Sequence, residues 1–181
     1  MKTIVFDFDY TLADSSIGAM KCICYALDKL DIKIMDENEI KKTIGMSLFD
    51  TYTYLTGDNN RSAAKLFSEY FIERADQIMA SNTFLFPDTA KTIRKLYKRK
   101  IRLGIVSTKF RYRINEILRR EKLDSYFDII IGGEDVSCHK PDPEGLFIIM
   151  KHYKIEPKDI LYVGDSIVDA KTAYNAGVNF I

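Results

Sequence analysis

The stretch Thr3-Ile4-Val5-Phe6-Asp7-Phe8-Asp9-Tyr10-Thr11, near the start of the chain, is the segment on which the fold depends. Its β-branched and aromatic residues, followed by polar ones, are typical of a strand buried on both faces of a parallel sheet. Asp7 and Asp9 stand two residues apart, so both carboxylates leave the end of this strand on the same side. Acidic residues are also common in turns after strands, and for this pair alone that explanation stays open.

Further along the chain, short apolar runs alternate with helical patterns. The later runs are Arg102–Val106, Phe127–Ile131, Ile160–Val163 and Gly177–Ile181. Between them, apolar residues recur at helical spacing after Pro87-Asp88, around Ile114 and around Leu146. Such alternation needs right-handed crossovers, so we expect an α/β fold whose core is a Rossmann-like parallel sheet with helices on both faces.

The interval from Ser15 to about Asn82 interrupts this alternation, because it has helical periodicity and no convincing buried strand. We expect residues 15–81 to form an all-helical cap inserted into a catalytic core made of residues 1–14 and 82–181. Such a block would sit above the carboxyl edge of the sheet, where open α/β sheets bind ligands, and would serve as a lid. Aromatic residues of the cap such as Phe49, Tyr52 and Tyr54 could select the leaving group, but we expect most of them in the core of the cap.

The composition excludes a disordered or collagen-like chain, since 46% of the 181 residues are hydrophobic and 29% are charged. With 27 basic and 26 acidic residues, the formal charge of +1 predicts neither a nucleic-acid nor a membrane partner. Three cysteines without paired metal-ligand spacing favour a reducing, cytoplasmic location. No apolar stretch approaches the ~20 residues of a spanning helix, and no signal peptide precedes the first strand, so we expect the chain to begin there.

One part of the chain is strongly basic. Between Lys91 and Lys122 there are 13 Lys and Arg residues against the two acids Glu116 and Glu121. The simpler interpretation is that these are the solvated outer faces of two helices. A second interpretation, a basic flank that steers anionic substrates or nucleic acid toward the site, stays open.

Polar residues follow three of the later strands as well. Ser107-Thr108-Lys109 comes after the second strand, Lys140-Pro141 comes shortly after the third, and Gly164-Asp165-Ser166-x-x-Asp169 comes after the fourth. Because parallel strands end at one edge of their sheet, we expect these groups to converge with the pair that follows the first strand.

Convergence would bring together four carboxylates, those of Asp7, Asp9, Asp165 and Asp169, with Lys140 as the plainest compensating cation. Two like charges ~4 Å apart repel by about 4 kcal/mol at an effective dielectric constant near 20, so the cluster needs a further cation. Oxygen-only ligands with room for water and a phosphoryl oxygen suit Mg²⁺ better than zinc.

The four groups in this order resemble the motifs of the haloacid dehalogenase superfamily. Those motifs read Asp-x-Asp-x-Thr, then Ser or Thr, then Lys, then Gly-Asp-x-x-x-Asp, and here they are Asp7-x-Asp9-x-Thr11, Ser107, Lys140 and Gly164-Asp165-x-x-x-Asp169. The match spans nearly the whole chain. The residues after the first two motifs are similar to the branch of phosphoglycolate phosphatases and β-phosphoglucomutases with a helical cap.

The resemblance implies a role for each of these residues. Asp7 would be the nucleophile that forms an aspartyl-phosphate, and Asp9 would protonate the leaving oxygen and then activate water. Lys140 would neutralise the developing charge. The phosphoryl oxygens or substrate would be bound by Thr11, Ser107, Thr108 and Lys109. Mg²⁺ would be held by Asp7, Asp165 and the Asp9 main-chain carbonyl, with Asp169 as a direct ligand or a residue that orients water.

The sequence departs from the family pattern in two places. Tyr10 stands where relatives usually have glycine, so its side chain must point away from the phosphate or narrow the pocket. Relatives also continue past the last strand with a further segment and a closing helix, whereas this sequence stops at Ile181. We expect a shortened core with an apolar sheet face left uncovered.

The favoured function is therefore a Mg²⁺-dependent hydrolase of phosphate monoesters that acts on a small phosphorylated metabolite, as a monomer or a homodimer. A phosphosugar mutase with the same intermediate stays open, as does a catalytically impaired or binding-only relative. A dehalogenase would need neither Asp9 nor a metal. A receiver-type signalling module would lack the large insertion, and nothing resembles the sugar-nucleotide site of a glycosyltransferase.

Overall fold

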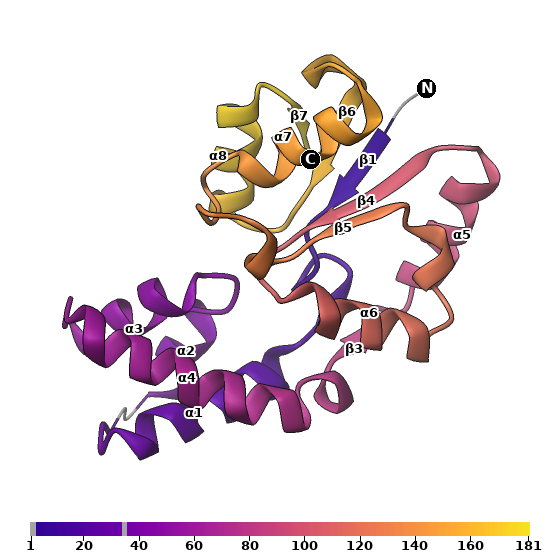
Figure 1. Cartoon of the computed structure of the whole chain (residues 1–181). Coiled ribbons are helices and arrows are strands. Elements are labelled where there is room, and N and C mark those ends of the chain that lie inside the picture. Colours follow the sequence, from indigo (N-terminus) through magenta and orange to yellow (C-terminus); the bar gives the residue numbers. More distant parts are fainter. Residues whose placement is uncertain (1–2, 34–35) are drawn as a thin grey trace. The chain divides into compact units, whose positions relative to one another are not determined.

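The computed structural model describes residues 3–33 and 36–181, and the chain divides into two compact units (Figure 1). The sheet unit comprises Met1–Asp14 and Leu85–Ile181, and the helical unit comprises Ser15–Phe84. Within the described part of the chain, no helix combines the length and the apolar character needed to cross a membrane.

The sheet unit is built on five parallel strands in the order β5-β4-β1-β6-β7. Their bounds are β1 Thr3–Phe6, β4 Arg102–Val106, β5 Ile129–Ile131, β6 Ile160–Val163 and β7 Asn179–Phe180. In the register of the central strand, Phe6 lies opposite Ile105 and Val163. The predicted α/β fold with a parallel sheet is confirmed, and all five predicted strands occur.

The first strand was predicted to reach Phe8 and ends at Phe6, and two of the later strands are also shorter than predicted. β5 begins at Ile129 and not at Phe127, because the N–H of Phe127 donates to the Asp124 carbonyl of a preceding 3-10 turn, η2 (Asp124–Tyr126). β7 covers only two of the five predicted residues, because Gly177 still belongs to the preceding helix end in a left-handed conformation, φ +70°.

Helices cover both faces of the sheet. They are α5 (Thr89–Lys98), α6 (Arg111–Arg120), α7 (Glu144–Tyr153) and α8 (Ile167–Ala176), with 3-10 turns η3 (Gly133–Asp135) and η4 (Pro157–Asp159) in the connections. Figure 1 shows α7 and α8 on one side of the strands and α5 and α6 on the other. Val5 and Tyr162 of the sheet pack with Leu146, Ile149 and Ala173 of α7 and α8 in one buried cluster.

The apolar face predicted for α5 is buried only in part. Ile93 is fully buried, whereas Tyr97 in the last turn of the helix is 50% exposed. The ring of Tyr97 packs edge-to-face on Tyr126, with 5.0 Å between the ring centroids, so it covers a turn at the rim of the sheet unit.

The helical unit contains α1 (Ser16–Lys29), α2 (Glu37–Lys42), α3 (Leu48–Thr56), α4 (Arg61–Ile78) and η1 (Ala80–Asn82). Its core joins Ile23, Leu27, Tyr52 and Phe67. The expectation that most of its aromatic residues are core is wrong for α3, where Phe49 and Tyr54 are 40% and 46% exposed. The reason is that only one face of this short helix, the one that carries Tyr52, packs on the core. β2 (Ala13–Asp14) and β3 (Phe84–Leu85) form a separate two-stranded sheet.

Candidate active site

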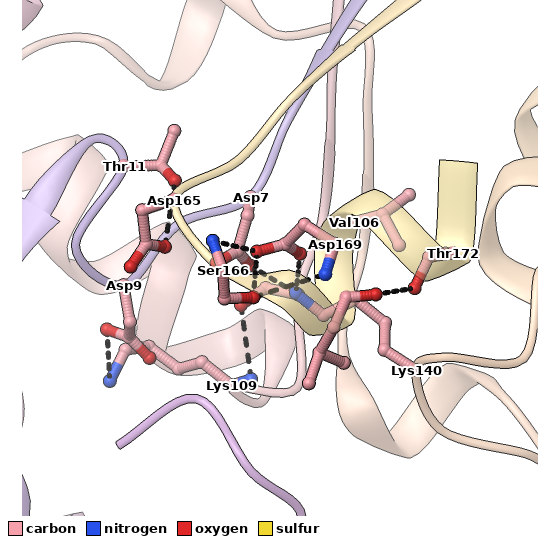
Figure 2. Close-up of polar contacts among 12 residues, drawn as sticks. Asp7, Asp9, Thr11, Val106, Lys109, Lys140, Asp165, Ser166, Asp169 and Thr172 are labelled. Carbon is pink, nitrogen blue, oxygen red and sulfur yellow. Dashed lines mark hydrogen bonds and ion pairs between the residues drawn. The ribbon is translucent and has the colours of Figure 1, made fainter. Parts of the chain in front are cut away.

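The polar residues that follow β1, β4 and β6 meet at the carboxyl edge of the sheet, as Figure 2 shows for the first and last motifs. Backbone hydrogen bonds fix the strand ends there: the N–H of Asp7 donates to the Val163 carbonyl at 2.8 Å, and the N–H of Ser107 donates to the Ile131 carbonyl at 3.0 Å. These bonds extend the ladder by one residue beyond each strand. The backbone of Asp7 and Ser107 is therefore fixed by the sheet, and this positions their side chains at its carboxyl edge.

Lys140 lies between two carboxylates. Its Nζ atom is 2.9 Å from Asp7 Oδ1 and 2.6 Å from Asp169 Oδ1. All three side chains are buried, at 5% exposure or less. Lys140 lies more than 20 residues before α8 and more than 130 residues after β1 in the chain. The fold nevertheless places its ammonium between two acids at the sheet edge, as the sequence predicts.

Asp169 accepts hydrogen bonds from three residues: Lys140 in a loop, Tyr162 in β6 and Ser166 at the start of α8. Its Oδ1 accepts from Lys140 Nζ and, at 2.9 Å, from the hydroxyl of Tyr162 in β6. Its Oδ2 accepts from the Ser166 hydroxyl and from the Ser166 N–H at 3.2 Å, in the capping box that begins α8. These four contacts use most of the lone-pair sites that one carboxylate offers.

Tyr162 is a site residue that the sequence reasoning missed. Its hydroxyl also lies 3.5 Å from Lys140 Nζ and 3.2 Å from the Val106 carbonyl, and its side chain is fully buried. The sequence does contain a signal for this residue, since Tyr162 is the one polar side chain in the aliphatic run Ile160–Val163. A buried tyrosine hydroxyl usually has a hydrogen-bond partner, so a polar neighbour could have been expected.

Gly164 allows α8 to start this close to the strand. A Cβ atom at this position would lie 2.5 Å from the Cβ of Asp169, which no side chain tolerates. The glycine of the Gly-Asp motif is therefore required for the close approach of Asp169 to the end of β6.

Protonation in the site follows from burial and from these contacts. Burial raises the pKa of Asp7 to about 6, against the attraction of Lys140, and the nearby charges of Asp169 and Asp9 add to the rise. Burial and repulsion from Asp169 also raise the pKa of Asp165. Burial by itself would lower the pKa of Lys140, but attraction to Asp7 and Asp169 raises it well above its usual value, so Lys140 stays an ammonium.

Asp169 behaves differently from its two acidic neighbours. Burial opposes its ionisation, yet the charge of Lys140 and the hydrogen bonds from Lys140, Ser166 and Tyr162 together hold its pKa below the usual value. Asp169 is thus the carboxylate that the protein itself neutralises. Asp7 and Asp165 are the two whose charge is left poorly compensated.

Three acids of the site fit a divalent cation. Asp7, Asp165 and Asp169 each offer a carboxylate oxygen, and these oxygens lie within 4.8 Å of one another. The donor set is oxygen only, as Mg²⁺ prefers, and a bound dication would relieve the unfavourable charge on Asp7 and Asp165. The hydroxyl of Thr11 donates to Asp165 Oδ1 at 3.3 Å and orients this exposed acid.

Asp9 forms an ion pair with a different lysine, Lys109. Its Oδ1 atom is 3.1 Å from Lys109 Nζ, and both side chains are nearly buried. The four expected carboxylates therefore form a group of three and a separate ion pair. Lys109 was expected to bind substrate, and in the structure its ammonium contacts Asp9. The Lys109 N–H donates to the Ser107 hydroxyl at 3.3 Å, in the turn that follows β4.

The remaining predicted residues also lie at this edge. Ser107 is buried at 5% exposure, and the carbonyl of Thr108 lies so near Gly133 that a Cβ there would come within 2.5 Å of it. Tyr10 takes a left-handed backbone conformation, φ 62°, which explains why glycine suits this position better. Its N–H donates to the Ala13 carbonyl at 2.8 Å in the turn that presents Thr11.

Comparison with known proteins finds relatives that match nearly the whole chain. The family model of haloacid dehalogenase-like hydrolases matches residues 4–181. Phosphoglycolate phosphatases of Shigella dysenteriae serotype 1 and Escherichia coli strain K12 are each 29% identical over 203 residues, which covers 98% of this chain and 79% of the relative. A crystal structure from Bacteroides fragilis, described as haloacid dehalogenase-like hydrolase, is 47% identical with a TM-score of 0.96 and covers 99% of this chain and 85% of that one.

Proposed function

The chain belongs to the haloacid dehalogenase-like hydrolases and is a phosphatase, and on this premise we propose that it hydrolyses a small phosphate monoester with Mg²⁺ through an aspartyl-phosphate. The observation that supports this most is the position of Lys140 between Asp7 and Asp169, with the exposed carboxylate of Asp165 close by. Phosphoryl transfer needs positioned positive charge around the phosphate and an ionised nucleophile, and this arrangement can supply both.

In the proposed reaction, a carboxylate oxygen of Asp7 attacks phosphorus while the bond from phosphorus to the leaving oxygen breaks. Asp9 gives its proton to that leaving oxygen. Asp9 then takes a proton from water, whose oxygen attacks phosphorus, and the bond to Asp7 breaks to release inorganic phosphate. Lys140 keeps Asp7 ionised in the presence of its acidic neighbours.

When bound, Mg²⁺ would orient the phosphoryl oxygens and offset their charge, held by Asp7, Asp165 and the main-chain carbonyl of Asp9. We propose that Asp169 is an anchor for Lys140 and not a direct ligand, because its oxygens already accept from Lys140, Tyr162 and Ser166. This choice would leave Asp165 as the main ligand from the fourth motif.

Other residues of the carboxyl edge would bind substrate and hold the acid in place. Ser107 and the backbone near Thr108 would bind the phosphoryl oxygens, and Thr11 would hold Asp165. Lys109 would fix the direction of Asp9 through their ion pair. We also propose that the helical unit is the cap that selects the leaving group.

We propose a small phosphorylated metabolite as the substrate, similar to that of the phosphoglycolate phosphatases. We also propose that the protein acts in the cytoplasm. No disulfide joins the cysteines in the described part of the chain, which suits a reducing compartment. Release of free phosphate without an isomerised product would separate this function from that of a phosphosugar mutase. A suitable screen covers phosphoglycolate, sugar phosphates, nucleotides and pyrophosphate, with and without Mg²⁺.

The assignment of Asp7 is tested by Asp7→Asn. We expect this variant to lose turnover of p-nitrophenyl phosphate, by at least a thousandfold, because an amide cannot form the acyl phosphate. Asp124→Asn, in the surface turn η2, is the matched control and should keep normal turnover. Circular dichroism checks that both variants fold, and normal turnover by Asp7→Asn would refute the assignment.

A further inference from the structure

A cavity lies at the edge of the sheet opposite to the candidate active site. It has a volume of about 800 Å³, within the usual range for small-molecule sites. Its wall includes Arg102, the first residue of β4, and Asp128, which immediately precedes β5. β4 has five residues that rise about 3.3 Å each, so Arg102 in the cavity wall lies about 16 Å along the strand from Ser107, and the cavity is separate from the carboxyl edge.

In one wall of this cavity, called the basal pocket below, three side chains contact one another. The Tyr153 hydroxyl donates to Asp128 Oδ2 at 3.1 Å, and the guanidinium of Arg102 lies over the Tyr153 ring, 4.9 Å from its centroid. Burial and the charge of Asp128 raise the pKa of Tyr153, so its hydroxyl remains a donor. A cation, a phenol and a carboxylate are thus fixed to one another by contacts from β4, α7 and the start of β5.

The other wall offers an aromatic face and two ammonium groups. Tyr97 is half exposed, and its edge-to-face contact with Tyr126 fixes the orientation of its ring. Lys98 and Lys100 line the same pocket and are exposed, and in the ranges 3–33 and 36–181 no carboxylate forms an ion pair with either. Lys98 also complements the partial negative charge at the end of α5, whereas Lys100 lies beyond the helix.

We propose that the basal pocket binds a mononucleotide, with its base stacked on Tyr97 and its phosphate bound by Lys98 and Lys100. A planar base suits the exposed tyrosine face, and the phosphate suits two unpaired ammonium groups beside Arg102. The second oxygen of Asp128 is available to accept from an exocyclic amine of the base. This site does not depend on the proposed function, and it accounts for part of the basic segment that the reaction does not use.

The test is titration calorimetry of the full chain with AMP, adenosine and inorganic phosphate, in the presence of a chelator to suppress turnover. We expect AMP to bind at least tenfold more tightly than adenosine or phosphate. Lys98→Glu with Lys100→Glu should weaken AMP binding at least tenfold, and Tyr97→Ala at least fivefold. The matched control, Lys91→Glu with Lys95→Glu, makes the same charge change on α5 outside the pocket and should alter the affinity less than twofold.

Three results would overturn the proposal. They are the absence of AMP binding at millimolar concentration, equal weakening by the control pair, and phosphate binding as tightly as AMP with no effect of Tyr97→Ala. The second result would mean diffuse charge attraction, and the third would mean a plain anion site. If the charge-reversed pair fails to fold by circular dichroism, Tyr97→Ala alone decides, because this side chain is half exposed and its loss removes little core packing.

Discussion

The buried ammonium of Lys140 joins two acids, Asp7 and Asp169, and has a chemical role in the proposed reaction. Removing one partner of a buried ion pair leaves an uncompensated charge, at a typical cost of 3–5 kcal/mol. Here the loss of Lys140 would leave both Asp7 and Asp169 without their common cation. The groups proposed for catalysis should therefore also contribute to stability.

Lys140→Met should lower the free energy of unfolding by about 3–5 kcal/mol in urea titrations at neutral pH. Lys158→Met, which breaks an exposed pair with Glu156, is the matched control and should leave stability unchanged. Part of the loss should return at lower pH, because the variant lacks the attraction of Lys140 that lowers the pKa of Asp7, so Asp7 is protonated more readily and one of the two stranded charges is removed. A Lys140→Met protein as stable as the wild type would show that the ion pairs are not formed in solution.

The raised pKa of Tyr153 predicts how the stability of the protein changes at alkaline pH. Burial and its hydrogen bond to Asp128 raise its pKa above the ordinary value of 10.0, so the folded state holds this proton more tightly than the unfolded state. The stabilisation is complete below pH 10 and declines as the pH rises through the pKa of the folded protein. Tyr153→Phe should therefore unfold with a shallower alkaline decline than the wild type, as measured by urea midpoints between about pH 8 and pH 12. Parallel pH curves for the two proteins would contradict this.

Two helices of the sheet unit, α7 and α8, both end in a residue with a left-handed backbone conformation. α8 ends at Gly177 with φ +70°, whereas α7 ends at Lys154 with φ 54°, a left-handed conformation that disfavours a side chain. Space is not the constraint at Gly177, since an added Cβ would meet its nearest neighbour at 3.9 Å. The difference between the two ends is therefore one of backbone conformation.

Gly177→Ala should destabilise the protein by about 1–2 kcal/mol, and Lys154→Gly should stabilise it by up to about 1 kcal/mol, because only glycine adopts this conformation without strain. Thermal and urea unfolding of the two single variants measure both effects. Changes of the same sign in both variants would show that the left-handed ends do not govern stability here.

Most elements could be predicted from local pattern. Ile114, Ile117 and Leu118 recur at helical spacing and are fully buried in α6, because an amphipathic helix places such residues on one face. Tyr97, by contrast, fits the periodicity of α5 and yet is half exposed, since the end of a helix can project beyond the sheet it covers. Periodicity predicts the face of a helix but not how far the neighbouring layer extends.

At the scale of the molecule, the sheet gathers acids that are distant in sequence and leaves part of their charge uncompensated. A ligand that binds only the folded state stabilises it by about 2.7 kcal/mol at a hundredfold excess over its dissociation constant. A cation bound by Asp7 and Asp165 should act in this way.

Saturating Mg²⁺ should therefore raise the midpoint of thermal unfolding, and a chelator should reverse the effect. Asp165→Asn should remove most of this response, whereas Asp124→Asn should keep it, because Asp124 lies in η2, away from the acidic cluster. Calorimetry at constant ionic strength separates binding from general screening. An equal response of the wild type and Asp165→Asn would argue against a metal bound at this edge.

The sequence by itself determined the parallel α/β fold and the position of each polar motif at or shortly after the end of a strand. These properties follow from hydrophobic periodicity and from polar residues at the ends of apolar runs, which are local in the chain. Only the tertiary structure decided which partner each side chain takes: Lys140 for Asp7 and Asp169, Lys109 for Asp9, and Tyr162 as a further donor. Pairing of this kind depends on distances between strand ends and on burial, which strengthens electrostatic contacts, and neither quantity is written in the spacing of residues.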